Sequence, residues 1–99
     1  MTQELELRPQ LQWFSQQMER VLRENDHKGG WCNERTEDLM DALCDEVGEL
    51  NFAACPPKGE SDSAQVICEA ADVAAFAMMI ADNAYVCAEV ERDEKQYRV

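Results

Sequence analysis

The amino-acid sequence predicts an all-α fold, a compact bundle of about four helices. Apolar residues recur at three- and four-residue steps through its first half, and a nearly continuous apolar run covers residues 66–81. No stretch alternates apolar and polar residues as a strand does, and no internal repeat is present. The 99 residues fit one domain, 1–99, and 45% of them are apolar. Because a chain this short buries a modest core, we expect copies of it to associate.

The composition is strongly acidic and excludes several kinds of partner. There are 21 Asp and Glu residues against nine Lys and Arg, a net charge of −12, which disfavours nucleic acids and anionic membranes. The longest apolar run contains two acids and is too short to span a bilayer, and the first ten residues do not resemble a signal peptide. Five cysteines without a C-x-x-C pair are expected to be small, semi-buried apolar residues of a cytoplasmic protein.

The first helix is expected over residues 9–25. Pro9 suits the first position of a helix, because the missing N–H has no partner there in any case. The residues that follow form an apolar stripe with a polar outer face. The stripe consists of Leu11, Phe14, Met18, Val21 and Leu22.

The segment from Asn25 to Asn33 interrupts the helical pattern. The Gly29-Gly30 pair allows backbone angles and close approaches that other residues prevent. Lys28 precedes the pair and Trp31 follows it, so a cation and a large ring flank a flexible turn. This arrangement is typical of a ligand-handling loop. The alternative is a simple helix–helix turn in which Trp31 caps the core.

A second helix is expected over residues 35–54, with Asn33 or Thr36 as its N-cap. Glu46 falls in the middle of its apolar face, and Glu49 lies at the edge of that face. The acids on the other side need no explanation beyond solvation. The apolar face consists of Leu39, Leu43, Leu50 and Ala54, and the outer acids are Asp38, Asp41 and Asp45.

A third helix is expected over residues 62–83, after a loop that contains Pro-Pro and Gly. The D-S-A-Q sequence from Asp62 fits a capping box. Glu69 shares a face with apolar residues, Asp72 lies beside it, and Asn83 returns to the same side near the helix end. The apolar residues of that face are Val66, Val73, Phe76 and Ile80. From residue 84 onward we expect a short helix or a tail.

Two E-x-x-[ED] pairs, Glu46/Glu49 and Glu69/Asp72, are the candidate metal-binding and catalytic residues. An antiparallel pairing of their helices sets four carboxylates facing one another in the interior, where ionised acids are costly unless a cation joins them. Oxygen ligands favour Mg²⁺, with Mn²⁺ also possible. Such a site can hold a triphosphate and activate a water, with Glu46 or Glu49 as the base. A di-iron bundle would need Glu-x-x-His pairs, and the single histidine, His27, lies in a loop.

These motifs resemble those of the MazG-like, all-α nucleoside triphosphate pyrophosphohydrolases, in particular the compact single-domain members of phages and mobile elements. The resemblance covers residues 11–83. The matching segments are K28-G-G-W31, E46-V-G-E49, E69-A-A-D72 and A71-D-V-A-A-F-A-M-M-I-A-D-N83.

The resemblance implies a homodimer or a dimer of dimers that hydrolyses nucleoside triphosphates with Mg²⁺ to the monophosphate and pyrophosphate, in the service of nucleotide-pool house-cleaning. Carried over by position, the four paired acids are the metal ligands. Trp31 borders the base, and Lys28 and Asn83 contact phosphate or sugar.

Two other functions stay open at this point. The chain could be a non-enzymatic acidic module that mimics DNA or blocks a basic partner, because many of its acids are expected on the outside. It could also keep the fold and bind nucleotides as a sensor without hydrolysing them.

Overall fold

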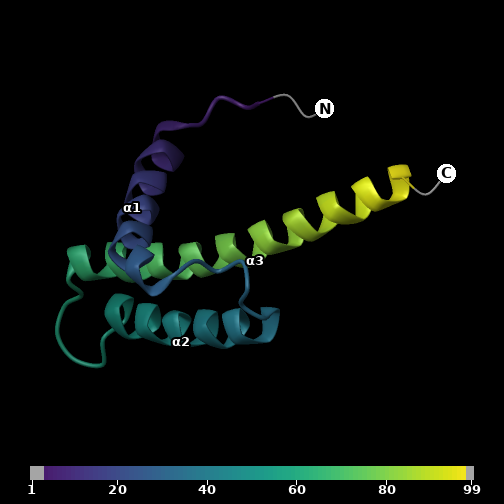
Figure 1. The fold of residues 1–99 in the computed structure, drawn as a ribbon. Helices are drawn as coiled ribbons and strands as arrows, with labels where there is room; N and C mark the ends of the chain where they lie inside the picture. The colour runs from purple at the N-terminus through teal and green to yellow at the C-terminus, as the bar shows by residue number, and fades with distance from the viewer. Residues whose placement is uncertain (1–3, 98–99) are drawn as a thin grey trace.

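The computed structural model describes residues 4–97, and the side chains of residues 4–92. This part of the chain is all-α, as predicted, and contains no strand. It has three α-helices and one short 3₁₀ turn, which Figure 1 shows in chain order. The elements are α1 (Pro9–Asn25), η1 (Asp26–Lys28), α2 (Thr36–Ala54) and α3 (Ser63–Tyr97).

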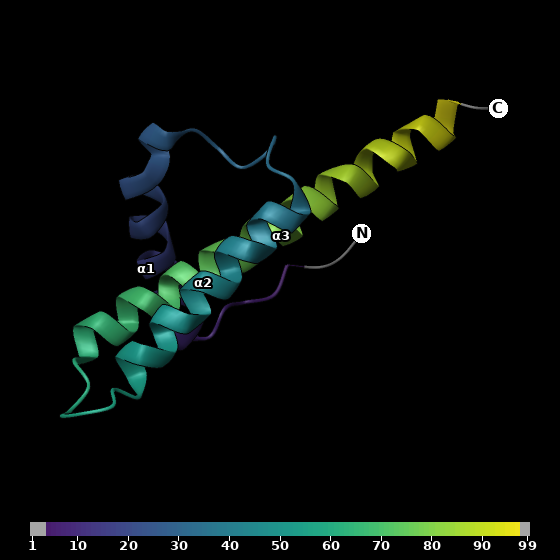
Figure 2. The ribbon, with the colours of Figure 1, turned by 90° about the horizontal axis from the view of Figure 1, so that it is seen from below.

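The helices α2 and α3 form an antiparallel hairpin, and they lie side by side in both Figure 1 and Figure 2. Residues 55–62 connect them, and Gly59 takes a φ of +81° within this loop. Asp62 caps α3, because its Oδ1 accepts a hydrogen bond from the Ala64 N–H at 3.0 Å. The expected capping box is only half formed, since the Gln65 amide donates to Glu69 Oε1 instead.

The N-cap of α2 differs from the expectation. Arg35 occupies this position with an extended backbone and makes no side-chain cap, while Thr36 is the first helical residue. The first turn is stabilised by charge instead. Glu37 and Asp38 lie near the positive end of the helix dipole, and Arg35 bridges both at 3.3 and 3.5 Å.

The core of the described chain is small and lies where α1 crosses α3. Val21 of α1 is buried against Ala71 and Ala75, whose small side chains let the two helices approach closely. Phe14, Leu22 and Met79 pack around these three and are half-buried. The expected apolar stripe of α1 therefore meets the first half of α3, and little else of the chain is shielded from solvent.

The prediction of a fourth, separate element after residue 84 is wrong, because α3 continues without a break for 35 residues. No Gly or Pro follows Gly59, and the last turns are rich in helix-forming residues. An ion pair between Arg92 and Glu89 at 3.0 Å also spans one turn. The bundle is consequently not compact, and its extents are 64 × 32 × 24 Å.

Within the described residues, α3 is also long and apolar enough over residues 63–92 to meet the length and composition criteria for a membrane span. The expectation that its apolar run is too short is therefore corrected. The helix still carries Glu69 and Asp72 in that run, and a core helix of a soluble protein passes the same criteria.

The five cysteines are all free and exposed, which overturns the expectation that they are semi-buried. They are Cys32, Cys44, Cys55, Cys68 and Cys87.

Candidate functional site: an acidic cluster beside a pocket

The hairpin brings together three of the four acids that the sequence pairs, Glu46, Glu49 and Glu69. Carboxylate oxygens of Glu46 and Glu49 from α2 and of Glu69 from α3 all lie within 4.8 Å of one another. Asp72 follows one turn after Glu69, and its charge contributes to raising the pKa of Glu46. One i,i+3 pair from each helix therefore contributes to a single acidic cluster.

The cluster is less buried than the helical periodicity suggested. Glu46, Glu69 and Asp72 are half-buried and Glu49 is exposed, so the prediction of four carboxylates in a dry interior is wrong in degree. The reason is that the acids line two hollows, Glu46 and Asp72 the first and Glu49 and Glu69 the second, through which solvent reaches them. Two oxygens are nevertheless buried without any hydrogen-bond partner, Glu46 Oε2 and Glu69 Oε2.

No basic side chain neutralises the cluster within the described residues. Their ion pairs join Arg23 to Glu19, Arg35 to the start of α2, and Arg92 to Glu89. All of these lie outside the cluster. The clustered acids therefore form no ion pair with a described basic side chain, and a bound divalent ion would relieve their repulsion.

The pKa values of two cluster members reflect this excess of negative charge. Partial burial raises the pKa of Glu46 to about 7, helped by a hydrogen bond with Glu49 and by the charges of Asp72, Glu49 and Glu69. The pKa of Asp72 is also raised, first by burial and then by the charges of Glu69, Glu49 and Glu24. Near neutral pH, Glu46 is therefore protonated in a sizeable fraction of the molecules.

Glu24 is an acid that the sequence reasoning missed. It belongs to α1, yet its charge contributes to the raised pKa of Asp72 on α3. The sequence contains a clue, because Glu24 follows the buried Val21 by three residues and so lies beside the apolar stripe. The crossing of α1 over α3 thus brings a third helix to the edge of the cluster.

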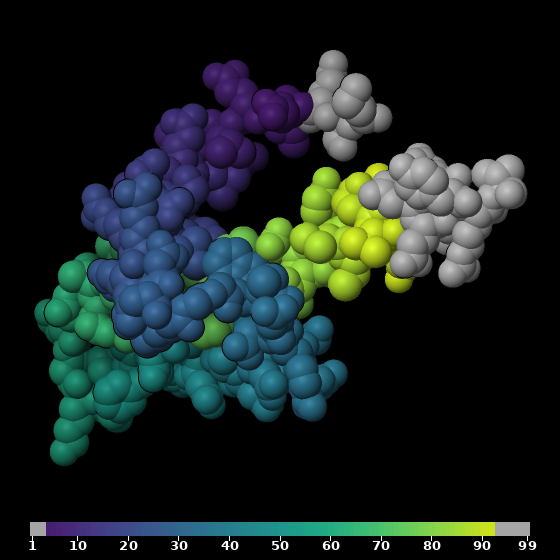
Figure 3. Space-filling view, in the orientation of Figure 1, coloured from purple at the N-terminus to yellow at the C-terminus, as the bar shows by residue number. Residues whose placement is uncertain are grey.

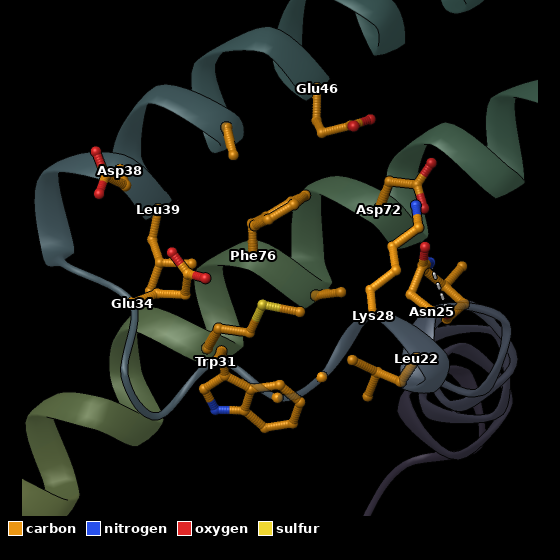
Figure 4. A pocket seen from close by; sticks show the side chains of 16 residues that line it. Leu22, Asn25, Lys28, Trp31, Glu34, Asp38, Leu39, Glu46, Asp72 and Phe76 are labelled. Carbon is orange, nitrogen blue, oxygen red and sulfur yellow. Dashed lines mark hydrogen bonds between the residues drawn. The ribbon is translucent and has the colours of Figure 1, made fainter.

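A pocket of about 430 Å³ opens beside the cluster, between the three helices and the glycine loop. Figure 4 shows Glu46 and Asp72 at one end of it, Trp31 at the other, and Phe76 between them. Lys28 also lines the pocket, from the loop side. The pocket thus combines an apolar wall and a lysine with acids on two sides, since Glu34 and Asp38 line it as well as Glu46 and Asp72. Its volume suits a small molecule.

Trp31 is fastened to α3 at two points. Its indole Nε1–H donates to Asp82 Oδ2 at 2.9 Å, and its carbonyl accepts from the Asn83 amide at 3.0 Å. Gly29, with a φ of +91°, lets the chain turn out of η1 to reach this position. The loop and the far end of the apolar run are therefore joined by side-chain hydrogen bonds.

The role of Asn83 in contacting a ligand stays a prediction. Its amide nitrogen is already engaged by Trp31, and the residue lies beside the pocket lining rather than in it. Asp82, in contrast, was assigned no role from the sequence, although it adjoins Asn83. Periodicity cannot find such a residue, because its partner lies 51 positions away in the sequence.

A second hollow, of about 600 Å³, lies on the other side of the acids. Glu49 and Glu69 line it together with Phe52 and the 56–62 loop. Glu46 and Asp72 line the first pocket, so the cluster separates two depressions. A ligand longer than either depression could cross the acids from one to the other.

Cys68, one residue before Glu69, does not act as a thiolate here. The pKa of its thiol is raised, first by desolvation and then by the charges of Asp72 and Glu69. At neutral pH the thiol of Cys68 therefore stays protonated. The donors of the described cluster are carboxylate oxygens.

The fold and the site define an all-α hairpin crossed by a third helix, with a carboxylate cluster between two hollows. Comparisons with protein-family models, with curated proteins and with solved structures found no match for this chain.

Proposed function

We propose that this protein is a Mg²⁺-dependent nucleoside triphosphate pyrophosphohydrolase of the MazG-like type. It would convert an NTP or dNTP and water into the monophosphate and pyrophosphate, acting in the cytoplasm as a homo-oligomer in nucleotide-pool house-cleaning. The observation that supports this best is the cluster of Glu46, Glu49 and Glu69, which forms no ion pair among the described residues and has two buried oxygens without a hydrogen-bond partner. It lies beside a pocket of suitable size.

The donor set fits a hard divalent ion. Glu46, Glu49, Glu69 and Asp72 would hold Mg²⁺, because they offer carboxylate oxygens, and Mn²⁺ has the same preference. When bound, the ion would offset the charge of the phosphates and make a water easier to deprotonate. The unpartnered oxygens of Glu46 and Glu69 would gain the partner that the protein does not supply.

The pocket beside the cluster would bind the base and the sugar of the nucleotide. Trp31 and Phe76 offer ring surfaces for a base, and the hydrogen bonds to α3 hold Trp31 in place before any ligand arrives. Among the described residues of the lining Lys28 is the one that carries a positive charge, and it would contact phosphate or sugar. The triphosphate would then extend toward the cluster.

The general base is Glu46 or Glu49, whose carboxylate oxygens lie within 4.8 Å of each other. As the water oxygen bonds to the attacked phosphorus, the water proton passes to this glutamate and the phosphoanhydride bond breaks, so that pyrophosphate leaves. Glu46 lines the pocket, while Glu49 is exposed on the far side of the cluster. No nucleophilic side chain takes part.

Pyrophosphate release over a panel of canonical and damaged NTPs and dNTPs, with Mg²⁺, tests the proposal. Glu46→Gln and Glu69→Gln should each lower turnover at least about 100-fold while the far-UV circular dichroism stays unchanged. Asp41→Asn is the matched control, because Asp41 is an exposed acid of the same helix outside the cluster and both hollows. Wild-type turnover in either Gln variant would refute the assignment.

The acids exposed on α2 favour one competing function, an acidic module that occupies a basic partner. Asp38, Asp41 and Asp45 are all exposed, as such a module requires. Thermal melts with and without Mg²⁺ plus a non-hydrolysable triphosphate separate the two, because a ligand that binds only the folded form raises the Tm. A Tm that does not respond favours the module, whereas a raised Tm without pyrophosphate release favours a nucleotide sensor.

A further inference from the structure

The turn that carries Trp31 also carries Glu34, an acid that the proposed reaction does not use. The Glu34 N–H donates to the Trp31 carbonyl at 3.1 Å and so closes a turn over residues 31–34. The same carbonyl accepts from the Asn83 amide at 3.0 Å, and the Trp31 indole donates to Asp82 at 2.9 Å. Figure 3 shows the loop that contains this turn, in blue, lying across α3 at the surface. The ring and the acid are therefore held on one short segment that is fastened to α3.

Glu34 lines the pocket on the side away from Lys28 and the acidic cluster. Figure 4 shows Lys28 and Asp72 at one side of the pocket and Glu34 at the other. A nucleotide with its triphosphate at the cluster and its base against Trp31 therefore turns the far edge of the base toward Glu34. That edge carries the groups that pair in nucleic acids, and proteins read it by hydrogen bonds.

Among the acids around the start of α2, Glu34 keeps its carboxylate available to a ligand. Arg35 bridges Glu37 and Asp38, at 3.3 and 3.5 Å. Within the described side chains of residues 4–92, no ion pair or hydrogen bond engages the Glu34 carboxylate. The side chain is exposed, so water solvates it, and a base that displaces this water has to supply N–H donors in its place.

We propose that Glu34 selects guanine as the base of the nucleotide, an inference that rests on the proposed function. Guanine presents two adjacent donors on its pairing edge, N1–H and the 2-amino group. The two oxygens of one carboxylate accept one hydrogen bond from each, and the negative charge strengthens both bonds. Because Trp31 stacks on the face of the base and Glu34 lies on the same turn, the ring and the acceptor recognise one flat molecule together.

The other bases leave part of this carboxylate without a donor. Adenine and cytosine present one amino group beside a ring nitrogen, which is an acceptor and repels the second carboxylate oxygen. Uracil and thymine present one N–H between two carbonyl oxygens, and these repel the carboxylate on both sides. Hypoxanthine is the sharpest comparison, because on this edge it differs from guanine only in lacking the 2-amino group.

Binding of non-hydrolysable triphosphates tests the proposal without requiring catalysis. The probes are α,β-methylene analogues of GTP, ITP, ATP, CTP and UTP with Mg²⁺, titrated against Trp31 fluorescence in a Trp13→Phe background. The GTP analogue should bind at least about 10-fold more tightly than each of the others, because a bidentate pair discriminates between bases to this extent. Equal dissociation constants for the GTP and ITP analogues, or tighter binding of another base, overturn the proposal.

A substitution at Glu34 tests whether this residue is the source of the preference. Glu34→Gln should bind the GTP and ITP analogues about equally, because an amide has one acceptor oxygen and offers no second acceptor to the 2-amino group. Glu37→Gln is the matched control and should keep the preference, because Glu37 is a nearby exposed acid that lines neither hollow. An unchanged preference in Glu34→Gln overturns the proposal, and the wild-type titrations decide it if this variant does not fold.

Pyrophosphate release separates this inference from the proposed function. The wild type is assayed with GTP and ITP in the presence of Mg²⁺. Guanine-selective binding without release refutes the hydrolysis and leaves the selection by Glu34 standing. Release with equal kcat/KM for GTP and ITP refutes the selection and leaves the hydrolysis standing.

Discussion

At the scale of single residues, Glu46 combines the features that a cation site needs and a stable fold does not. It is half-buried, one of its oxygens has no partner, and burial together with three other acids raises its pKa to about 7. Such a group lowers stability when it is ionised, because the unfolded chain solvates the charge better. The ionised acids of the cluster therefore repel one another in the native state, and a bound cation would relieve this repulsion.

The first prediction concerns the pH dependence of stability. The folded pKa of Glu46 lies above its usual 4.5, so the native state holds more protons between these values, and stability falls as pH rises from about 4.5 to about 7. Glu46→Gln should remove this loss and raise stability at pH 8 by about 1–2 kcal/mol, after allowance for the partial exposure of the carboxyl. Urea unfolding at pH 5 and pH 8 measures it. If the free energy of unfolding differs between Glu46→Gln and the wild type by the same amount at pH 5 and at pH 8, the raised pKa does not belong to Glu46.

A second prediction concerns the attachment of Trp31. Asp82→Asn removes the charge from the acceptor of the indole hydrogen bond, and Asp82→Ala removes the acceptor altogether. We expect Asp82→Ala to cost about 1 kcal/mol and Asp82→Asn less. Urea unfolding followed by Trp31 fluorescence, in a Trp13→Phe background, measures the effect. If both variants match the wild type in stability and in emission maximum, the hydrogen bond does not hold the loop.

At the scale of elements, the sequence pattern predicts the hairpin well and the last helix poorly. Apolar periodicity places α1, α2 and the first half of α3, because each packs one face against another helix. It fails beyond residue 84, since Tyr85, Val86 and Val90 are left exposed and their pattern indicates no boundary. Helix propensity, and the lack of any Gly or Pro after Gly59, continue the helix there instead.

Replacing each of the two glycines of the hairpin with alanine should change the stability of the protein in opposite directions. Gly48 lies inside α2, and no atom lies within 4 Å of the place that a Cβ would occupy, so Gly48→Ala should stabilise the helix by about 0.5–1 kcal/mol. Gly59 has open space too, but its φ of +81° is strained for alanine, so Gly59→Ala should destabilise by about 1 kcal/mol. Thermal melts of both variants measure the difference, and a change of the same sign in both would contradict the explanation.

At the scale of the whole molecule, the sequence predicts which acids come together but not how deeply they lie. The two i,i+3 pairs and the antiparallel hairpin bring Glu46, Glu49 and Glu69 together. Their burial depends on what covers the seam, and one chain leaves it partly open. The contributions of Glu24 and Asp82 depend on the crossing of α1 and on the folded loop, and these are tertiary contacts without a local pattern.

The last prediction concerns the effect of Mg²⁺ binding at the acidic cluster on the thermal stability of the whole protein. Mg²⁺ that binds the native acids should raise the Tm, and the rise should be larger at pH 8 than at pH 6, because protons and Mg²⁺ compete for Glu46. At ten times its dissociation constant the ion should add about 1.4 kcal/mol, a shift of several degrees for a domain of this size. Glu69→Gln should abolish most of the shift and Asp41→Asn should keep it. Because both variants remove one negative charge, an equal shift in the two would mean that Mg²⁺ screens the acidic surface in general and does not occupy the cluster.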